Sequence, residues 1–198
     1  MGEVFIDYNN NVYNKYSNID MLSHNIVSYL LKNNEDIWKL LKYNTSNALS
    51  QPNLTKDDKS NLIYSGQTSE EPYRVFTKSL PIDATEYKQT QLRIWLGKIL
   101  PTNNITGQID MYIQIISHSS IITLDSYSRN RNEVMLRELI STLNGQEISG
   151  ITPFSFNQLG NGLNNEALWG KMGEKYYEGY LLKMSCKVSS VQPNGMNI

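Results

Sequence analysis

The stretch YYEGYLLKMSCKVSSV, residues 176–191, decides the kind of fold expected for this chain. Read at a period of two, one side of the backbone carries Tyr180, Leu182, Met184, Cys186 and Val188. The other side carries Lys183, Ser185, Lys187 and Ser189. This alternation predicts a half-buried β-strand with one face on a core and the other face wet. At about a dozen residues the strand is longer than the typical five or six. Two interpretations are open: its outer face contacts a neighbouring protein chain, or that face is solvated and the length has no further role.

Three earlier segments also predict strands, because they are rich in aromatic and β-branched residues. They are YRVFTKSL (73–80), QLRIWLGKIL (91–100) and GQIDMYIQIIS (107–117). The third has the clearest alternation, with Ile109, Met111, Ile113 and Ile115 on one face. Pro101 and the Thr-Asn-Asn that follows it predict a turn, so the second and third segments are expected to form a hairpin.

The first 70 residues are predicted to be helical. One apolar stripe is formed by Ile19, Leu22, Ile26, Leu30 and Leu31. Asn34 is the expected N-cap of a second helix. Thr55 and Asp58 have capping-box spacing for a third, which is expected to end near Gly66.

A further helix is predicted to begin after Asn130, with Glu133 at capping spacing, and to stop at Gly145. Its expected buried stripe is Met135, Leu136, Leu139, Ile140 and Leu143. A short strand, QEISGI (146–151), is expected next, followed by a long loop over 153–173 that has no sustained period.

These elements predict an α+β fold, in which N-terminal helices precede a mixed or antiparallel sheet packed against one long helix. Two parts are expected, a helical segment over 1–70 and an α+β domain over 71–198, or else one continuous domain. The sequence shows no internal repeat.

The charge balance argues against a nucleic-acid binder, with 18 basic and 19 acidic residues. Cys186 is the only cysteine, so a disulfide within the chain is impossible, and its position predicts a small buried side chain. No apolar run is long enough to span a bilayer, which indicates a cytosolic type of protein with no membrane partner.

No motif predicts an enzyme, a cofactor or a metal site. His24 and His118 have no carboxylate or thiol at ligand spacing and are interpreted as solvent-facing or capping histidines. Arg129, Arg131 and Arg137 crowd one region, but glutamates interrupt them. They are expected at a solvated or interface end of the helix, with Glu133 and Arg137 forming a surface pair.

The second half of the chain resembles the tail terminator and neck proteins of long-tailed bacteriophages. The resemblance covers about residues 73–191 and lies in the order GQIDMYIQIIS, a return SIITLDSYS, the helix NEVMLRELISTLNG, QEISGI, a variable loop and YYEGYLLKMSCKV. It implies a structural virion protein that forms a homo-oligomeric ring, a hexamer, at the head–tail junction. Such a ring caps the tail tube, joins it to the neck or connector proteins, and lets genome DNA pass without tight binding.

It also implies a location in the virion, and in the host cytoplasm before assembly. The alternatives are another neck, connector or tail-completion subunit, or, from a different class, a small ligand-binding or enzymatic domain whose site includes the 153–173 loop.

The 153–173 loop is expected to be an interaction element, because it is too apolar for an idle loop. Deletion of residues 160–165 is expected to leave the fold intact and weaken assembly. The expected contact residues are Phe154, Phe156, Trp169, Tyr176 and Tyr177, since tryptophan and tyrosine are enriched at interface hot spots.

Overall fold

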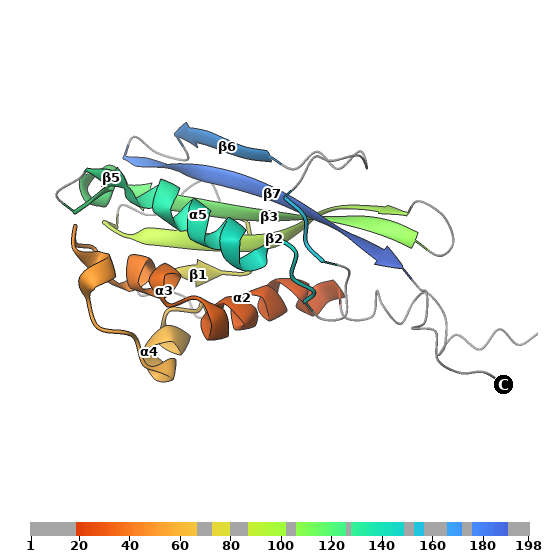
Figure 1. Cartoon of the computed structure of the whole chain (residues 1–198), viewed down its shortest axis with the longest axis horizontal. Helices are drawn as coiled ribbons and strands as arrows, with labels where there is room; N and C mark the ends of the chain where they lie inside the picture. Colours follow the sequence, from red (N-terminus) through yellow and green to blue (C-terminus); the bar gives the residue numbers. More distant parts are fainter. Residues whose placement is uncertain are drawn as a thin grey trace, which may run out of the picture.

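A computed structural model describes residues 19–66, 73–79, 87–101, 106–125, 128–148, 153–156, 166–171 and 176–189. The helices are α2 (Leu22–Asn33), α3 (Glu35–Lys42), α4 (Lys56–Asn61) and α5 (Arg131–Leu143), with short 3-10 turns η2 (Ile19–Met21), η3 (Ala48–Ser50) and η4 (Ser119–Ile121). The strands are β1 (Val75–Phe76), β2 (Thr90–Pro101), β3 (Thr106–His118), β4 (Thr123–Leu124), β5 (Arg129–Asn130), β6 (Glu166–Lys171) and β7 (Tyr177–Ser189). The predicted α+β class is confirmed (Figure 1).

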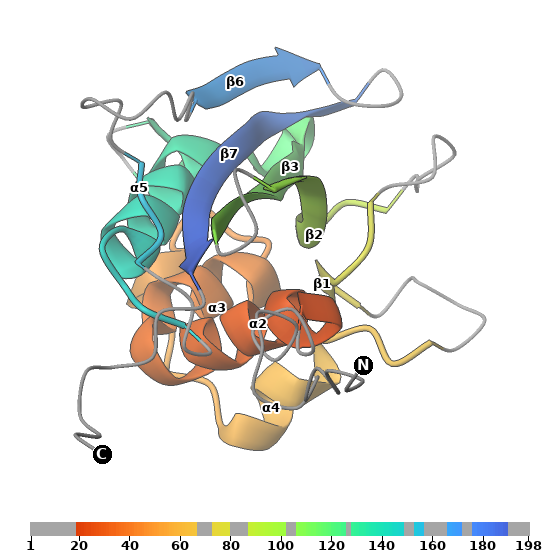
Figure 2. The same ribbon diagram turned by 90° about the vertical axis from the view of Figure 1, so that its right-hand side faces the viewer.

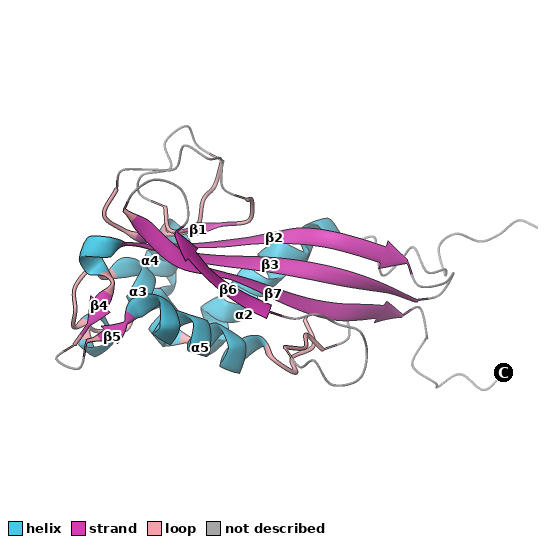
Figure 3. Cartoon of the chain, turned by 90° about the horizontal axis from the view of Figure 1, so that it is seen from above, coloured by secondary structure: helices cyan, strands magenta, loops and turns pink. Residues whose placement is uncertain are grey.

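The main sheet is mixed and has the strand order β1-β2-β3-β7-β6. β1 runs parallel to β2, and the other neighbours are antiparallel. The three long strands lie side by side through the middle of the sheet (Figure 3). The predicted hairpin of β2 and β3 is confirmed, with one register shift between Leu96 and Ile99.

Because side chains alternate along β3 and β7, the apolar side chains of one face of the sheet lie in the core. Ile109, Met111, Ile113, Ile115, Leu182, Met184 and Cys186 are all buried in one apolar cluster with helix residues. The expectation of a single covering helix is wrong in detail, because α2 and α3 contact β2 while α5 contacts β3 and β7 (Figure 2). Three helices share the face because no single helix is wide enough to cover three strands spaced about 4.8 Å apart. The cluster includes residues from both sides of residue 70; the division there stays a prediction.

Local capping explains where the helices begin. The Asn34 side chain accepts a hydrogen bond from the Ile37 amide at 2.9 Å, and Thr55 with Asp58 forms the predicted capping box. Asn130 caps α5 as predicted, although it accepts from the Asn132 amide and makes no box with Glu133. The helix stops before Gly145, whose φ of +77° is a backbone conformation that glycine adopts easily.

Several short elements differ from the prediction. The 73–80 strand is only Val75–Phe76, and the helix expected to end near Gly66 ends at Asn61. In the return over 120–128, the described residues form the end of the 3-10 turn η4 and the two-residue β4, and residues 126–127 lie outside the described part. Residues 146–148 are not a strand, and residues 149–151 lie outside the described part. The short β1 pairs with β2, a partner that its own sequence does not reveal.

Candidate interaction surface

The edge of the sheet is formed by β6, which lies inside the segment predicted to be a loop. Glu166–Lys171 pairs antiparallel with β7, so that Leu168 lies opposite Leu181 and Trp169 opposite Tyr180. The expectation of a continuous loop over 153–173 is therefore wrong for β6. The strand has only six residues, too few for a clear period against its glycine- and asparagine-rich surroundings. The residues of the proposed 160–165 deletion lie outside the described part of the chain.

Two large apolar side chains of this edge strand are exposed. Leu168 is 53% exposed and Trp169 is 55% exposed. Since neighbouring side chains along a strand point to opposite faces, Trp169 lies on the helix-covered face beside Tyr180, and Leu168 lies on the other face. An edge strand with exposed apolar residues is a ready site for association, which soluble proteins usually avoid. This pair marks the edge as a candidate protein contact.

The residue before β7 adds a second exposed aromatic ring. Tyr176 is 53% exposed and stacks on His118 with ring centroids 5.6 Å apart. Its neighbour Tyr177 is 4% exposed, meets His118 edge-on, and donates a hydrogen bond to the Tyr87 carbonyl. His118 caps η4 by accepting from the Ser120 amide, as predicted for a capping histidine. Burial, and then the charge of Lys88, lowers the pKa of His118 below its ordinary value.

The five predicted contact residues therefore have different environments. Trp169 and Tyr176 are exposed, Phe156 is half-buried against the core, and Phe154 and Tyr177 are buried. Phe154 is 1% exposed within the apolar cluster, so its side chain already packs in the core of the folded chain. Trp169 and Tyr176 are thus the two predicted contact residues with exposed side chains.

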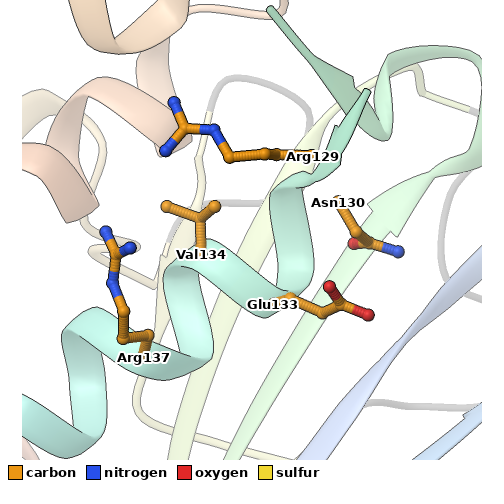
Figure 4. A pocket seen from close by; sticks show the side chains of 5 residues that line it. All are labelled: Arg129, Asn130, Glu133, Val134 and Arg137. Carbon is orange, nitrogen blue, oxygen red and sulfur yellow. The ribbon is translucent and has the colours of Figure 1, made fainter. Parts of the chain in front are cut away.

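A shallow hollow lies beside the start of α5. Its volume is about 250 Å³, and it is lined by Arg129, Asn130, Glu133, Val134 and Arg137. Figure 4 shows the two arginines and Val134 directed to one side of the helix, with Glu133 directed toward β7. The hollow thus combines the apolar side chain of Val134 with two cations, one carboxylate and one amide.

The charges around the hollow are paired locally. Arg129 pairs with Asp125, and Arg137 pairs with Glu138 at 2.6 Å. The expected pair of Glu133 with Arg137 is not the one formed, because the two side chains point to different sides of α5 (Figure 4). Burial, and then the charge of Glu133, raises the pKa of Tyr180 above its ordinary value.

Arg131 holds α5 in place and was missed as a core residue. It is fully buried and donates to the carbonyl oxygens of Ile121, Leu40, Tyr43 and Thr45 over 2.7–2.9 Å. The acceptors lie at the end of α3, in the chain after it and in η4. Arg131 thereby fixes the end of α5 that carries the hollow.

The face of the sheet opposite the helices contains a buried ion pair. Asp110 is 2% exposed, accepts from Ser185 at 2.7 Å and Gln108 at 2.8 Å, and lies 3.1 Å from the Lys183 ammonium. Burial alone would raise the pKa of Asp110, but these hydrogen bonds and the charge of Lys183 outweigh it and lower the pKa below the ordinary value. Ser185 was expected to face water and is fully buried instead.

The cysteine and the potential metal ligands of the described residues can be compared with the sequence prediction. Cys186 is buried as predicted, and burial followed by the charge of Asp110 raises the pKa of its thiol to about 12. Within the described ranges no group of three histidine, cysteine, aspartate or glutamate side chains is placed to hold a metal ion. In the same part of the chain no helix has the length and apolar character needed to cross a membrane.

The fold and this surface define an α+β protein whose sheet has an exposed aromatic edge. The chain belongs to the YomW family, whose model matches residues 34–186. The family is phage-associated, so the chain is a bacteriophage-type protein. No curated protein matches the chain.

Proposed function

We propose that this chain is a structural subunit of a phage particle that closes into a homo-oligomeric ring at the head–tail junction. The ring, a hexamer, caps the tail tube, joins it to the neck and lets DNA pass. The subunit collects in the host cytoplasm before it enters the virion.

The observation that carries the proposal is the exposed aromatic edge of the sheet at β6. Trp169, at 55% exposure, and its neighbour Leu168 lie on the last strand of the described sheet. A ring subunit needs an exposed surface that a neighbouring copy covers, and tryptophan is enriched at the centres of such contacts. The phage-associated family and the resemblance of residues 73–191 to tail terminator and neck proteins support the same role.

The hollow beside α5 gives little support to a small-ligand or enzymatic role. At about 250 Å³ it is smaller than the roughly 300–1,000 Å³ typical of sites for drug-sized ligands. Another neck, connector or tail-completion subunit remains the related alternative, which differs in the proteins that the ring contacts.

Native mass spectrometry of the purified chain, alone and with purified tail-tube protein, tests the proposal. We expect a closed oligomer of six copies in at least one of the two samples. A strict monomer in both would contradict the ring.

A duplex DNA titration tests the passive passage of the genome. With 18 basic and 19 acidic residues, we expect no complex at micromolar protein in about 150 mM salt, because tight binding requires clustered cations that neutralise several phosphates. Fluorescence anisotropy measures this directly. Tight, steeply salt-dependent binding would contradict the passive ring and favour a nucleic-acid-binding role.

A further inference from the structure

We propose that Trp169 of one copy inserts into the hollow beside α5 of the next copy, and that this contact builds the ring. The inference rests on the proposed ring and identifies its contact. The occupant of the hollow is therefore a side chain of a second copy of this chain.

The first argument is the chemistry of the hollow. Val134 supplies an apolar floor, and Arg129 and Arg137 flank it with side chains that are 45% and 62% exposed. Asn130 and Glu133 complete the lining, with Glu133 directed to the other side of the helix. A flat aromatic ring between guanidinium groups gains both apolar contact and cation–π attraction, and tryptophan is the strongest aromatic partner for such cations. A guanidinium group that pairs with a carboxylate through its N–H edge can still stack on an aromatic ring through its face.

The second argument is size. A hollow of about 250 Å³ is below the range of small-molecule sites, and it suits one large side chain. Among the large apolar side chains that are exposed in the described part of the chain, Trp169 is the one tryptophan, at 55% exposure.

The third argument is geometry. Trp169 lies on β6 beside Tyr180, whereas the arginines and Val134 are directed away from β7, on the far side of α5 (Figure 4). Glu133, the other charged residue that lines the hollow, is directed toward β7, so the separation concerns the arginine side of the hollow. The projecting ring and that side of the hollow are formed by different residues of the subunit. When each copy gives its ring to one neighbour and receives a ring from another, the contact is head-to-tail, and a rotation that closes generates a ring.

The direct test compares Trp169→Ala with the double variant Arg129→Glu/Arg137→Glu by light scattering and native mass spectrometry. We expect either change to weaken the subunit contact by at least about 30-fold, the usual effect of losing a hot-spot residue. The milder Arg129→Gln/Arg137→Gln variant should fall between these variants and the wild type. Leu168→Ala is the matched control: it removes an equally exposed side chain from the other face of β6 and should leave the contact within about threefold of wild type.

Mixing the two defective variants gives the sharper result. The Trp169→Ala copy keeps an intact hollow, and the double-glutamate copy keeps an intact tryptophan, so one productive contact can form between them. We expect equimolar mixing to yield 1:1 dimers and no ring, although each variant alone is monomeric. Recovery of the dimer also shows that both variants are folded.

The outcomes separate this contact from the ring itself. Rings formed equally well by all variants would overturn the contact and leave the proposed ring standing. Variants that are monomeric alone but form no dimer when mixed would also overturn the head-to-tail assignment. A wild-type chain that is monomeric with and without tail-tube protein removes both proposals.

Discussion

Replacement of Arg131 by methionine should destabilise the fold strongly, because this side chain ties α5 to α3. Methionine fills much of the same volume and removes every donor. Four carbonyl oxygens, those of Ile121, Leu40, Tyr43 and Thr45, then lose the hydrogen bonds that they now accept over 2.7–2.9 Å.

The magnitude follows from two opposing free energies. Burial lowers the pKa of Arg131 from 12.5 to about 10, which corresponds to a desolvation cost of about 3 kcal/mol. Hydrogen bonds to a charged group contribute roughly 1.5–3 kcal/mol each, so four of them outweigh that cost. With these four hydrogen bonds lost, the one to Leu40 in the buried interior, we expect the free energy of unfolding to fall by at least about 3 kcal/mol.

Urea unfolding followed by circular dichroism measures the change, and the slope with denaturant shows whether the transition stays cooperative. Arg129→Met is the matched control, because its side chain is 45% exposed and its surface pair with Asp125 is worth at most about 1 kcal/mol. Arg131→Lys keeps the charge but loses the planar fork, so it should fall between the two. A loss below about 1 kcal/mol for Arg131→Met, with an unchanged slope, would refute the reasoning.

Two further predictions concern the sheet. In thermal unfolding, Gly179→Ala should destabilise the fold by roughly 3 kcal/mol, because the new Cβ would lie 1.8 Å from the Ile115 carbonyl oxygen. Gly170→Ala, on the paired strand, is the control and should be neutral, because no atom lies within 4 Å of its new Cβ. Equal effects of the two alanines would contradict the close approach. Asp110→Asn should lower the free energy of unfolding at pH 7, because the folded state lowers the pKa of the Asp110 carboxyl and is stabilised by its ionised form. The difference in unfolding free energy between variant and wild type should shrink as the pH falls below 3.8 and through the lower pKa of the folded state, because the protonated carboxyl no longer stabilises the fold. A difference that stays constant from pH 7 to pH 2 in urea unfolding would show that the Asp110 charge is not responsible.

The strands and caps are predictable from the sequence because their signals are local. The alternation of side chains along 107–117 and 176–191 depends only on the extended backbone, and it gave the buried faces of β3 and β7. The caps at Asn34 and Thr55 depend on atoms within three residues, so their spacing in the sequence is enough to identify them.

The candidate surface was only partly predictable. The composition of the 153–173 segment singled out Trp169, and the exposed position of that residue agrees with a contact role. Its place on an edge strand depends on pairing with β7, which no local pattern encodes in six residues. Phe154 has the same aromatic character but lies in the core, because burial depends on which elements pack over a residue.

Tertiary structure alone decided the roles of the charged residues. Arg131 is indistinguishable in sequence from Arg129 and Arg137, yet it lies buried among acceptors, three of which are 86 to 91 residues away along the chain. Asp110 and Ser185, 75 residues apart, meet because β3 and β7 pair in that register. A charged side chain can be buried only where distant segments together supply its hydrogen-bond partners, and that convergence exists only once the chain has folded.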